Sequence, residues 1–407
     1  MQEIQLLYSY PDDDMLFLRS KSFQRERKLQ MNCPYNKKCG GCQNINRPYE
    51  EQLRLKQKYV DQLLSSFGKV HPIIGMEDPY HYRNKVHHVV CTDSKGNGYT
   101  GIYAEKSHRV IPVDRCLIEN EKADEICASV ASLMKSFKMK AYNEDKGTGF
   151  LRHILIRTGH ITGQILVVLV VASPVFPSKH NFVKALRKLH PEITSIVANV
   201  NNRGTSMVLG EKQQVLYGKG YIEDILCGKR FRISPKSFYQ VNSVQTEVLY
   251  AKAVEYAQLT GKETVIDAYS GIGTIGMVAS DHAREVISIE LNEEAVKDAY
   301  ANARNNRIKN IHFVKADAGQ HMKKMALQKQ HADVVFMDPP RAGSDAKFID
   351  SVVRLNPERI VYISCNPVTL KRDLEMFGKR GYKVRKIQPV DMFPGTEHVE
   401  CVVSITK

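Results

Sequence analysis

The chain contains 407 residues, 43% of them hydrophobic and 25% charged, and these proportions exclude a mostly disordered, collagen-like or membrane-embedded protein. At this length we expect two or three domains. The formal net charge of +15 suits an anionic partner such as nucleic acid, although a solvated basic surface has the same composition.

The sequence also indicates where the protein resides. The longest apolar run, Ile165 to Ala172, is far shorter than the ~20 residues needed to cross a bilayer, so we expect no membrane partner. No charged-then-apolar segment at the N-terminus resembles a secretory signal. The nine cysteines are spread along a chain without an export signal, which predicts a reduced, cytoplasmic compartment and favours metal binding or catalysis over disulfides.

The first predicted domain, residues 1–76, carries a basic run, a cysteine-rich loop and one helix. Residues 19–28 contain five cations and one glutamate, and residues 33–42 read CPYNKKCGGC. Apolar residues recur at three- to four-residue spacing from Pro48 to Phe67, which predicts a helix with one apolar face.

The second predicted domain, residues 77–230, has short apolar runs that alternate with Gly, Pro and Asn turns, which predicts a strand-rich domain with few helices. Residues 151–230 contain 11 Lys and Arg against 4 Asp and Glu, so this domain is the expected RNA-contacting surface. Strands are expected at Val86–Cys91, Ile154–Ile156, Ile165–Val171 and Ile196–Val200, and a helix at Phe182–Leu189.

The third predicted domain, residues 231–407, begins with a helix that Asn242 can cap and that runs to about Leu259. Apolar strands then alternate with helices, which predicts an α/β, doubly wound, Rossmann-like sheet with helices on both faces. The expected strands are Val265–Ala268, Val286–Glu290, His312–Lys315, Val334–Asp338, Ile360–Ser364 and Val399–Ile405.

A glycine-rich turn follows the first of these strands. Gly271, Gly273 and Gly276 fit a dinucleotide fingerprint, and Glu290 ends the next strand, where a carboxylate can accept hydrogen bonds from ribose hydroxyls. The turn fits a nicotinamide or flavin dinucleotide, S-adenosylmethionine, or no ligand. Asp267 at the strand end favours S-adenosylmethionine, because a carboxylate suits an amino-bearing or cationic ligand and would repel a pyrophosphate.

Two further carboxylates end later strands of the same sheet. Asp338 precedes Pro339 and Pro340, which stiffen the loop and hold Asp338 at the carboxyl edge, where it can contact a flat base or its amino group. A rigid turn is the alternative. Asp317 can contact adenine, and an ordinary polar loop residue is an equally good interpretation.

The last two strands bring a thiol and a carboxylate to the same edge. The Ser-Cys-Asn-Pro turn around Cys365 places the thiol at a strand tip, so Cys365 is the candidate nucleophile of this domain, whereas Cys401 is expected to be buried filler. Alternation puts Glu400 on one face of its strand and Val399 on the other. Glu400 can therefore face Cys365, or it is a solvent-exposed carboxylate.

Together these loops resemble the S-adenosylmethionine-dependent RNA uracil-C5 methyltransferases. The matching strings are FYQVN, DAYSGIG, SIE, DPPRAG, YISCNP and MFPGTEHVE, with YRNKV and GIYAEKSHRVIPVDRC further back. CPYNKKCGGC resembles the iron–sulfur motif of the branch that modifies 23S ribosomal RNA. The likeness extends from about Cys33 to the C-terminus.

The resemblance implies a class I methyltransferase domain and assigns roles to residues. Gln240, Tyr269, Glu290 and Asp338 would hold S-adenosylmethionine, Cys365 would be the nucleophile and Glu400 the base. Thiolate addition at carbon 6 of uracil activates carbon 5 for methylation, and a base must then remove the carbon-5 proton so that the cysteine can leave. Many ribosomal members also carry an N-terminal TRAM domain, and the 32 residues before Cys33 are too few for one.

The cysteine-rich loop predicts a metal site. Cys33, Cys39 and Cys42 would supply three thiolates, and Cys116, which matches the family position, or Cys91 would supply the fourth. Four thiolates can hold a [4Fe-4S] cluster or a tetrahedral zinc ion, and the resemblance favours the cluster.

The expected function is formation of 5-methyluridine by a monomer, and the resemblance favours 23S ribosomal RNA as substrate because the transfer-RNA branch lacks the cysteine loop. Transfer RNA is the alternative substrate. An amino-group methyltransferase acting on nucleic acid would leave Cys365 idle, a dinucleotide oxidoreductase would leave Cys365 and Glu400 unexplained, and the presence of both residues argues against an inactive RNA-binding protein.

Overall fold

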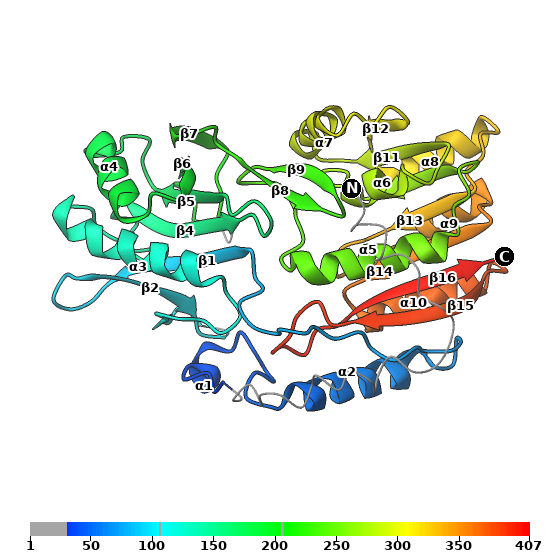
Figure 1. The fold of residues 1–407 in the computed structure, drawn as a ribbon, viewed down its shortest axis with the longest axis horizontal. Coiled ribbons are helices and arrows are strands. Elements are labelled where there is room, and N and C mark those ends of the chain that lie inside the picture. The colour runs from blue at the N-terminus through cyan, green and yellow to red at the C-terminus, as the bar shows by residue number, and fades with distance from the viewer. Residues whose placement is uncertain (1–30, 106, 205–206) are drawn as a thin grey trace, which may run out of the picture.

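The computed structural model describes residues 31–105, 107–204 and 207–407, so the basic run at residues 19–28 lies outside the described residues. The chain builds two seven-stranded sheets with a two-stranded hairpin between them (Figure 1). In the described ranges, no helix is both long enough and apolar enough to cross a bilayer.

The C-terminal sheet has the strand order β12-β11-β10-β13-β14-β16-β15. Strands β10 to β14 are parallel, β16 runs antiparallel to β14, and β15 runs antiparallel to β16. The strands are β10 (Thr264–Ala268), β11 (Glu285–Glu290), β12 (Ile311–Lys315), β13 (Val334–Met337), β14 (Arg359–Ser364), β15 (Lys383–Val390) and β16 (Glu400–Thr406). The predicted alternation of strands and helices is confirmed, but the sheet is mixed because its last two strands form an antiparallel pair.

Helices cover both faces of this sheet, and its central strands are therefore buried on both sides. One face packs against α5 (Ser243–Ala257), α6 (Thr274–Ala279) and α7 (Glu293–Asn305). The other packs against α8 (Ala318–Leu327), α9 (Ala346–Leu355) and α10 (Pro367–Gly378). As predicted, Asn242 caps α5, and its side chain accepts a hydrogen bond from the amide of Gln245 at 3.2 Å.

The central sheet has the order β3-β2-β1-β4-β5-β6-β7. Its strands are β1 (Lys85–Thr92), β2 (Gly98–Tyr103), β3 (Val110–Pro112), β4 (Leu151–Thr158), β5 (Ile165–Val171), β6 (Ile193–Val200) and β7 (Lys212–Tyr217). The helices α3 (Glu121–Ser136) and α4 (Lys179–Leu189) pack on one face. The strand-rich character predicted for this region is confirmed.

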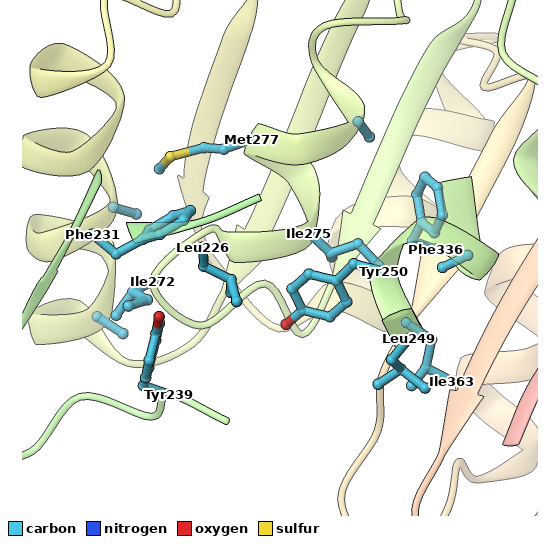
Figure 2. Packing of buried hydrophobic residues seen from close by; sticks show 14 of the residues in the cluster. Leu226, Phe231, Tyr239, Leu249, Tyr250, Ile272, Ile275, Met277, Phe336 and Ile363 are labelled. Carbon is cyan, nitrogen blue, oxygen red and sulfur yellow. The ribbon is translucent and has the colours of Figure 1, made fainter. Parts of the chain in front are cut away.

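A hairpin of β8 (Ile222–Leu226) and β9 (Lys229–Ile233) joins the two sheets. Figure 2 shows Leu226 and Phe231 of this hairpin in the same buried cluster as Tyr239 and Met277. The cluster also includes Leu155 and other residues from the second face of the central sheet, so one continuous core connects the two sheets.

The N-terminal segment lies along the C-terminal sheet. The short helix α1 (Asn36–Cys39) lies within the cysteine-rich loop, and α2 (Tyr49–Leu64) corresponds to the helix predicted at residues 48–67. Val60 and Leu64 of α2 are fully buried in the cluster that contains α10 and β15, and Figure 1 shows α2 running beside these elements. Helix α2 and Ile73 therefore contribute to the core of the C-terminal domain, while the proposed three-domain division stays a prediction.

Candidate active site

The site lies at the carboxyl edge of the C-terminal sheet. The strand order reverses between β10 and β13, because β11 and β12 lie on one side of β10 and β14 lies on the other side of β13. In open α/β sheets the loops at such a point form a ligand-binding crevice. Asp267 and Asp338 end these two central strands, and Cys365 ends the next.

The glycine-rich turn is held by a buried carboxylate. Asp267 is 1% exposed and accepts hydrogen bonds from the amide of Gly276 at 3.0 Å and from the hydroxyl of Ser288 at 3.3 Å. A Cβ at position 276 would lie 2.6 Å from both of these side chains, so only glycine fits there. The pKa of Asp267 is raised to about 8. Burial is the main cause, and the charges of Asp338 and Glu290 also raise this pKa, whereas the two hydrogen bonds lower it.

Glu290 links the end of β11 to the same turn. One carboxylate oxygen accepts a hydrogen bond from the amide of Gly271 at 2.9 Å, and the other accepts one from the amide of Asn292 at 2.7 Å. Gly271 has a φ of 56°, a left-handed conformation that glycine adopts at little cost. The crevice therefore gathers three carboxylates around the turn, a surrounding that favours a positively charged ligand.

Tyr269 begins the turn with a φ of 63°, which is uncommon for a residue other than glycine. Its ring packs against Phe348, with 4.9 Å between the ring centroids. Asp317 caps α8 by accepting a hydrogen bond from the amide of Gln320 at 2.9 Å. Burial, together with the charges of Asp317, Asp345 and Asp373, raises the pKa of Tyr269 to about 12.

Gln240 enters from the segment that connects the hairpin to α5. Gln240 is 8% exposed, and its backbone carbonyl accepts a hydrogen bond from the Nδ2 atom of Asn84 at 2.9 Å. The helix that follows is tied to the glycine-rich turn, because the hydroxyls of Tyr250 and Thr274 are hydrogen-bonded at 2.8 Å. The structure thus places this segment between the central sheet and the crevice.

Cys365 lies in a cleft of about 380 Å³ beside the crevice. The turn is fixed by Asn366, whose side-chain oxygen caps α10 through the amide of Val368 at 3.1 Å and whose side-chain nitrogen donates to the carbonyl of Arg341 at 3.1 Å. The loop after β13 and the loop after β14 are therefore bound to each other. Cys365 is partly exposed between them, as expected for a thiol that must reach a substrate.

Glu400 lies at the start of β16 and is only 3% exposed. Its Oε2 atom is buried without a hydrogen-bond partner, and burial together with the charge of Asp338 raises its pKa well above the ordinary value, against the influence of Arg341. Burial and the charges of Glu400 and Asp338 raise the pKa of Cys365 to about 11. The structure thus brings Cys365, Glu400 and Asp338 together, and Cys401 on the other face of the strand is fully buried, as predicted.

Residues that were not singled out from the sequence also line the Cys365 cleft, among them Asn44, Lys56, Tyr59 and His398. Three of these four come from the N-terminal segment, which is more than 300 residues away in the chain. A periodic helix signal marks the apolar face of α2, but it carries no information about which distant loop that helix contacts. His398 could have been noticed, since it lies two residues before Glu400.

The cysteine-rich loop gathers its thiols at one end of the central domain. Burial raises the pKa of Cys42 to about 12, with further contributions from Cys39 and Cys33. Burial and Glu119 raise the pKa of Cys116, and the same glutamate acts on Cys39 and Cys42. Glu119 therefore lies near three of these thiols, those of Cys39, Cys42 and Cys116.

The alternative fourth thiol lies elsewhere. Cys91 is in β1, where burial raises the pKa of its thiol and a hydrogen bond with Tyr99 lowers it. None of the other cysteines contributes to that shift, in contrast to the mutual influence among the cysteines of the loop.

Near this loop lies a buried group of three ionisable side chains that no sequence motif predicted. Across the described ranges, the one set of three potential ligand atoms within 4.8 Å of one another belongs to His88, Glu119 and Asp124. His88 and Glu119 form an ion pair at 3.0 Å, and Asp124 accepts a hydrogen bond from the amide of Cys116 at 2.7 Å. The sulfurs of the cysteine-rich loop are thus more widely spaced than the atoms of this group.

Comparison with known proteins identifies the family. Residues 48–407 match the model of the family described as tRNA (Uracil-5-)-methyltransferase. The chain belongs to the tRNA (uracil-5-)-methyltransferase family. It is thereby an S-adenosylmethionine-dependent RNA methyltransferase by family, and RNA is its expected substrate. The family match begins after Cys42 and includes Cys365 and Glu400.

Relatives in the tRNA (uracil-5-)-methyltransferase family agree with this assignment. An uncharacterized RNA methyltransferase of Halalkalibacterium halodurans is 43% identical over 380 residues, which cover 92% of this chain and 83% of the relative. One of Caldanaerobacter subterraneus is 43% identical over 379 residues, covering 92% and 84%.

A solved structure of the family gives the same fold. The Pyrococcus abyssi tRNA (uracil-54, C5)-methyltransferase, solved in complex with S-adenosyl-L-homocysteine, is 28% identical, with a TM-score of 0.75 over 90% of this chain and 86% of that chain. The class I methyltransferase fold expected from the sequence is therefore confirmed.

Proposed function

We propose that this protein forms 5-methyluridine in 23S ribosomal RNA, with Cys365 as nucleophile and Glu400 as base. The observation that carries the proposal is the register of β14 and β16, in which Ser364 pairs with Cys401. This register puts the partly exposed thiol of Cys365, directly after β14, next to the buried carboxylate of Glu400 at the start of β16. We propose that the protein acts as a monomer.

In the proposed reaction Cys365 and Glu400 act in different steps. The thiolate of Cys365 adds to carbon 6 of uracil, and the resulting enolate carbon 5 takes the methyl group from S-adenosylmethionine. Glu400 then removes the proton from carbon 5, the electrons re-form the 5,6 double bond, and the bond from carbon 6 to sulfur breaks. The raised pKa of Glu400 suits this last step, because a stronger base accepts a carbon-bound proton more readily.

S-adenosylmethionine fits the crevice beside the cleft. Its sulfonium and amino groups are positively charged, and the charges of Asp338 and Glu290 raise the pKa of the buried carboxyl group of Asp267, an effect that a bound cation would relieve. We propose that the cofactor is held by Gln240, Tyr269, Glu290, Asp317 and Asp338.

The cysteine loop supports the choice of ribosomal RNA. Cys33, Cys39, Cys42 and Cys116 would hold a [4Fe-4S] cluster, because four thiolates are the donor set that such clusters use. The same donor set can hold a tetrahedral zinc ion, and the resemblance of CPYNKKCGGC to the iron–sulfur motif favours the cluster. When bound, such a cluster would cross-link the loop to the central domain.

Transfer RNA is the second candidate substrate, favoured by the structural likeness to the Pyrococcus abyssi enzyme, which acts on a transfer RNA. An amino-group methyltransferase is the least suitable candidate, since it would use neither the thiol of Cys365 nor the base. The two RNA substrates are therefore compared directly in the experiment.

The test incubates the protein with radiolabelled S-adenosylmethionine and either unmodified 23S ribosomal RNA or unmodified transfer RNA, and identifies the labelled nucleoside. We expect 5-methyluridine in ribosomal RNA, lost in Cys365→Ala and retained in the control Cys227→Ala, a cysteine of the hairpin outside the cleft. Label in transfer RNA alone would make that the substrate. Label in N-methylated adenine or cytosine would overturn uracil-C5 chemistry.

A further inference from the structure

One loop separates β15 from β16 and ends directly before the proposed base. Residues 391–398, here called the 391–398 loop, read DMFPGTEH and are followed by Val399 and Glu400. The loop contains no helix or strand, and its shape is set by one internal turn, in which the amide of Thr396 donates to the carbonyl of Phe393 at 3.2 Å, and by contacts with other segments. The position of Glu400 relative to Cys365 depends on that shape.

The N-terminal segment holds this loop at its tip. The amide of Gly395 donates to the side-chain oxygen of Gln52 at 2.8 Å, and its carbonyl accepts from the amide of Asn44 at 2.9 Å. A Cβ on Gly395, which has a φ of 84°, would lie 2.7 Å from the side chain of Ile45, so the two segments touch directly. The amide of Glu397 donates to the side chain of Gln43 at 3.3 Å.

The base of the loop is held by a buried ion pair. Lys56 on α2 and Asp391 are 2% and 0% exposed, and the Nζ atom of Lys56 lies 2.6 Å from a carboxylate oxygen of Asp391. The other oxygen accepts from the hydroxyl of Tyr49 at 3.0 Å. Two buried charges are seldom kept without a specific use, because apolar side chains of similar size often give equal or greater stability.

Lys56 is also connected to the end of the loop through a series of hydrogen bonds. It donates to the carbonyl of Phe393 at 3.0 Å, and the same carbonyl accepts from the hydroxyl of Thr396 at 2.9 Å. That hydroxyl in turn accepts from the amide of His398 at 3.2 Å. The series ends two residues before Glu400, and both Lys56 and His398 line the cleft that contains Cys365.

We propose that Lys56 is a positioning residue for proton removal: paired with Asp391, it fixes the 391–398 loop so that Glu400 faces the substrate bound to Cys365. The proposal rests on the proposed function, since it assigns Glu400 as the base. It connects the cysteine-bearing N-terminal segment to the chemistry, because Gln43 and Asn44 follow Cys42 directly and hold the same loop.

The test uses Lys56→Met, the double variant Lys56→Met with Asp391→Asn, and the matched control Lys58→Met, an exposed lysine on the same helix. The double variant removes both charges, so no unpaired charge is left buried if the single variant fails to fold. Hydrogen exchange followed by mass spectrometry reports on the 391–398 loop without any need for activity.

We expect the loop amides to exchange at least tenfold faster in the double variant and unchanged in Lys58→Met, with the amides of Val402 and Val403 in β16 as an internal reference. With RNA and S-adenosylmethionine, the double variant should release product at least tenfold more slowly and should accumulate the covalent protein–RNA adduct, while its affinity for S-adenosylhomocysteine stays within twofold of wild type.

Unchanged loop exchange in the double variant would overturn the positioning role, whatever the activity. Faster exchange with normal product release would also overturn it, because the loop would then not control the base. If the loop loosens as expected but the wild-type protein forms no 5-methyluridine in any RNA, the proposed function fails while the connection between Lys56 and the loop stands.

Discussion

The substitution Glu400→Gln separates the two halves of the proposed reaction. Glutamine has nearly the shape of glutamate but cannot accept the carbon-5 proton. Neither the addition of Cys365 to uracil nor methyl transfer needs that proton to leave, so both steps should proceed. The reaction should then stop with the methylated uracil still joined to the enzyme through sulfur.

The size of the effect follows from the surroundings of Glu400. Glu400 is 3% exposed, and its Oε2 atom has no hydrogen-bond partner. No group bonded to this atom could therefore accept the proton in place of Glu400. A well-placed general base contributes about 10²- to 10⁴-fold, or roughly 2.7–5.5 kcal/mol of barrier. From a typical turnover on the order of 10 per second, release would fall to about 10⁻¹–10⁻³ per second.

These rates allow the adduct to be captured by hand. The protein is mixed with RNA and S-adenosylmethionine, stopped in denaturant after about ten seconds to an hour, and run on a denaturing gel, where the adduct migrates as a slower band. The band should be absent when Cys365 is also changed to alanine. Turnover at the wild-type rate would remove Glu400 as the base, and an inactive variant without adduct would assign it to an earlier step.

Three further predictions test other parts of the structure. Glu290→Ala should weaken S-adenosylmethionine binding roughly 10- to 150-fold in calorimetry, because hydrogen bonds to a charged acceptor contribute about 1.5–3 kcal/mol, and RNA binding should persist. The purified protein should be brown and contain iron, and Cys116→Ser should lose the metal while Cys91→Ser keeps it; one zinc and no iron would reject the cluster. The pKa of Asp338 is raised from 3.8 to about 7 by burial, so the folded state binds the proton more tightly and loses stability as pH rises from about 4 to 7. Asp338→Asn should therefore unfold at higher urea concentration than wild type at pH 8, by up to about 4 kcal/mol, and lose this advantage at pH 4.

The C-terminal fold could be predicted from the sequence because its signals are local. Each parallel strand is a short apolar run followed by a turn, and the strand expected at residues 265–268 corresponds to β10. The exception is β15, which was not predicted. Its first half is charged and exposed and it contains Pro389, as an edge strand allows, so it lacks the continuous apolar pattern of its neighbours.

The candidate site could be predicted only where its residues follow strands. Cys365 and Asp338 end neighbouring parallel strands, and topology alone brings them to one edge. Lys56 and Tyr59 are different, because they belong to a helix whose partner lies more than 300 residues away. The helical spacing puts Lys56 on the same face as Val60 and Leu64, but nothing in the local sequence identifies Asp391 as its partner.

The ion pair of Lys56 and Asp391 also has a consequence for how the chain is made. The two residues are 335 positions apart, and ribosomes add about 5–20 residues per second, so α2 waits on the order of 20–70 seconds for its partner. Throughout that time the apolar face of α2 and a lysine that is buried in the finished protein remain in water. The nascent chain therefore has no completed cleft until the last loops are made, because the cleft is lined both by α2 and by residues 397–399.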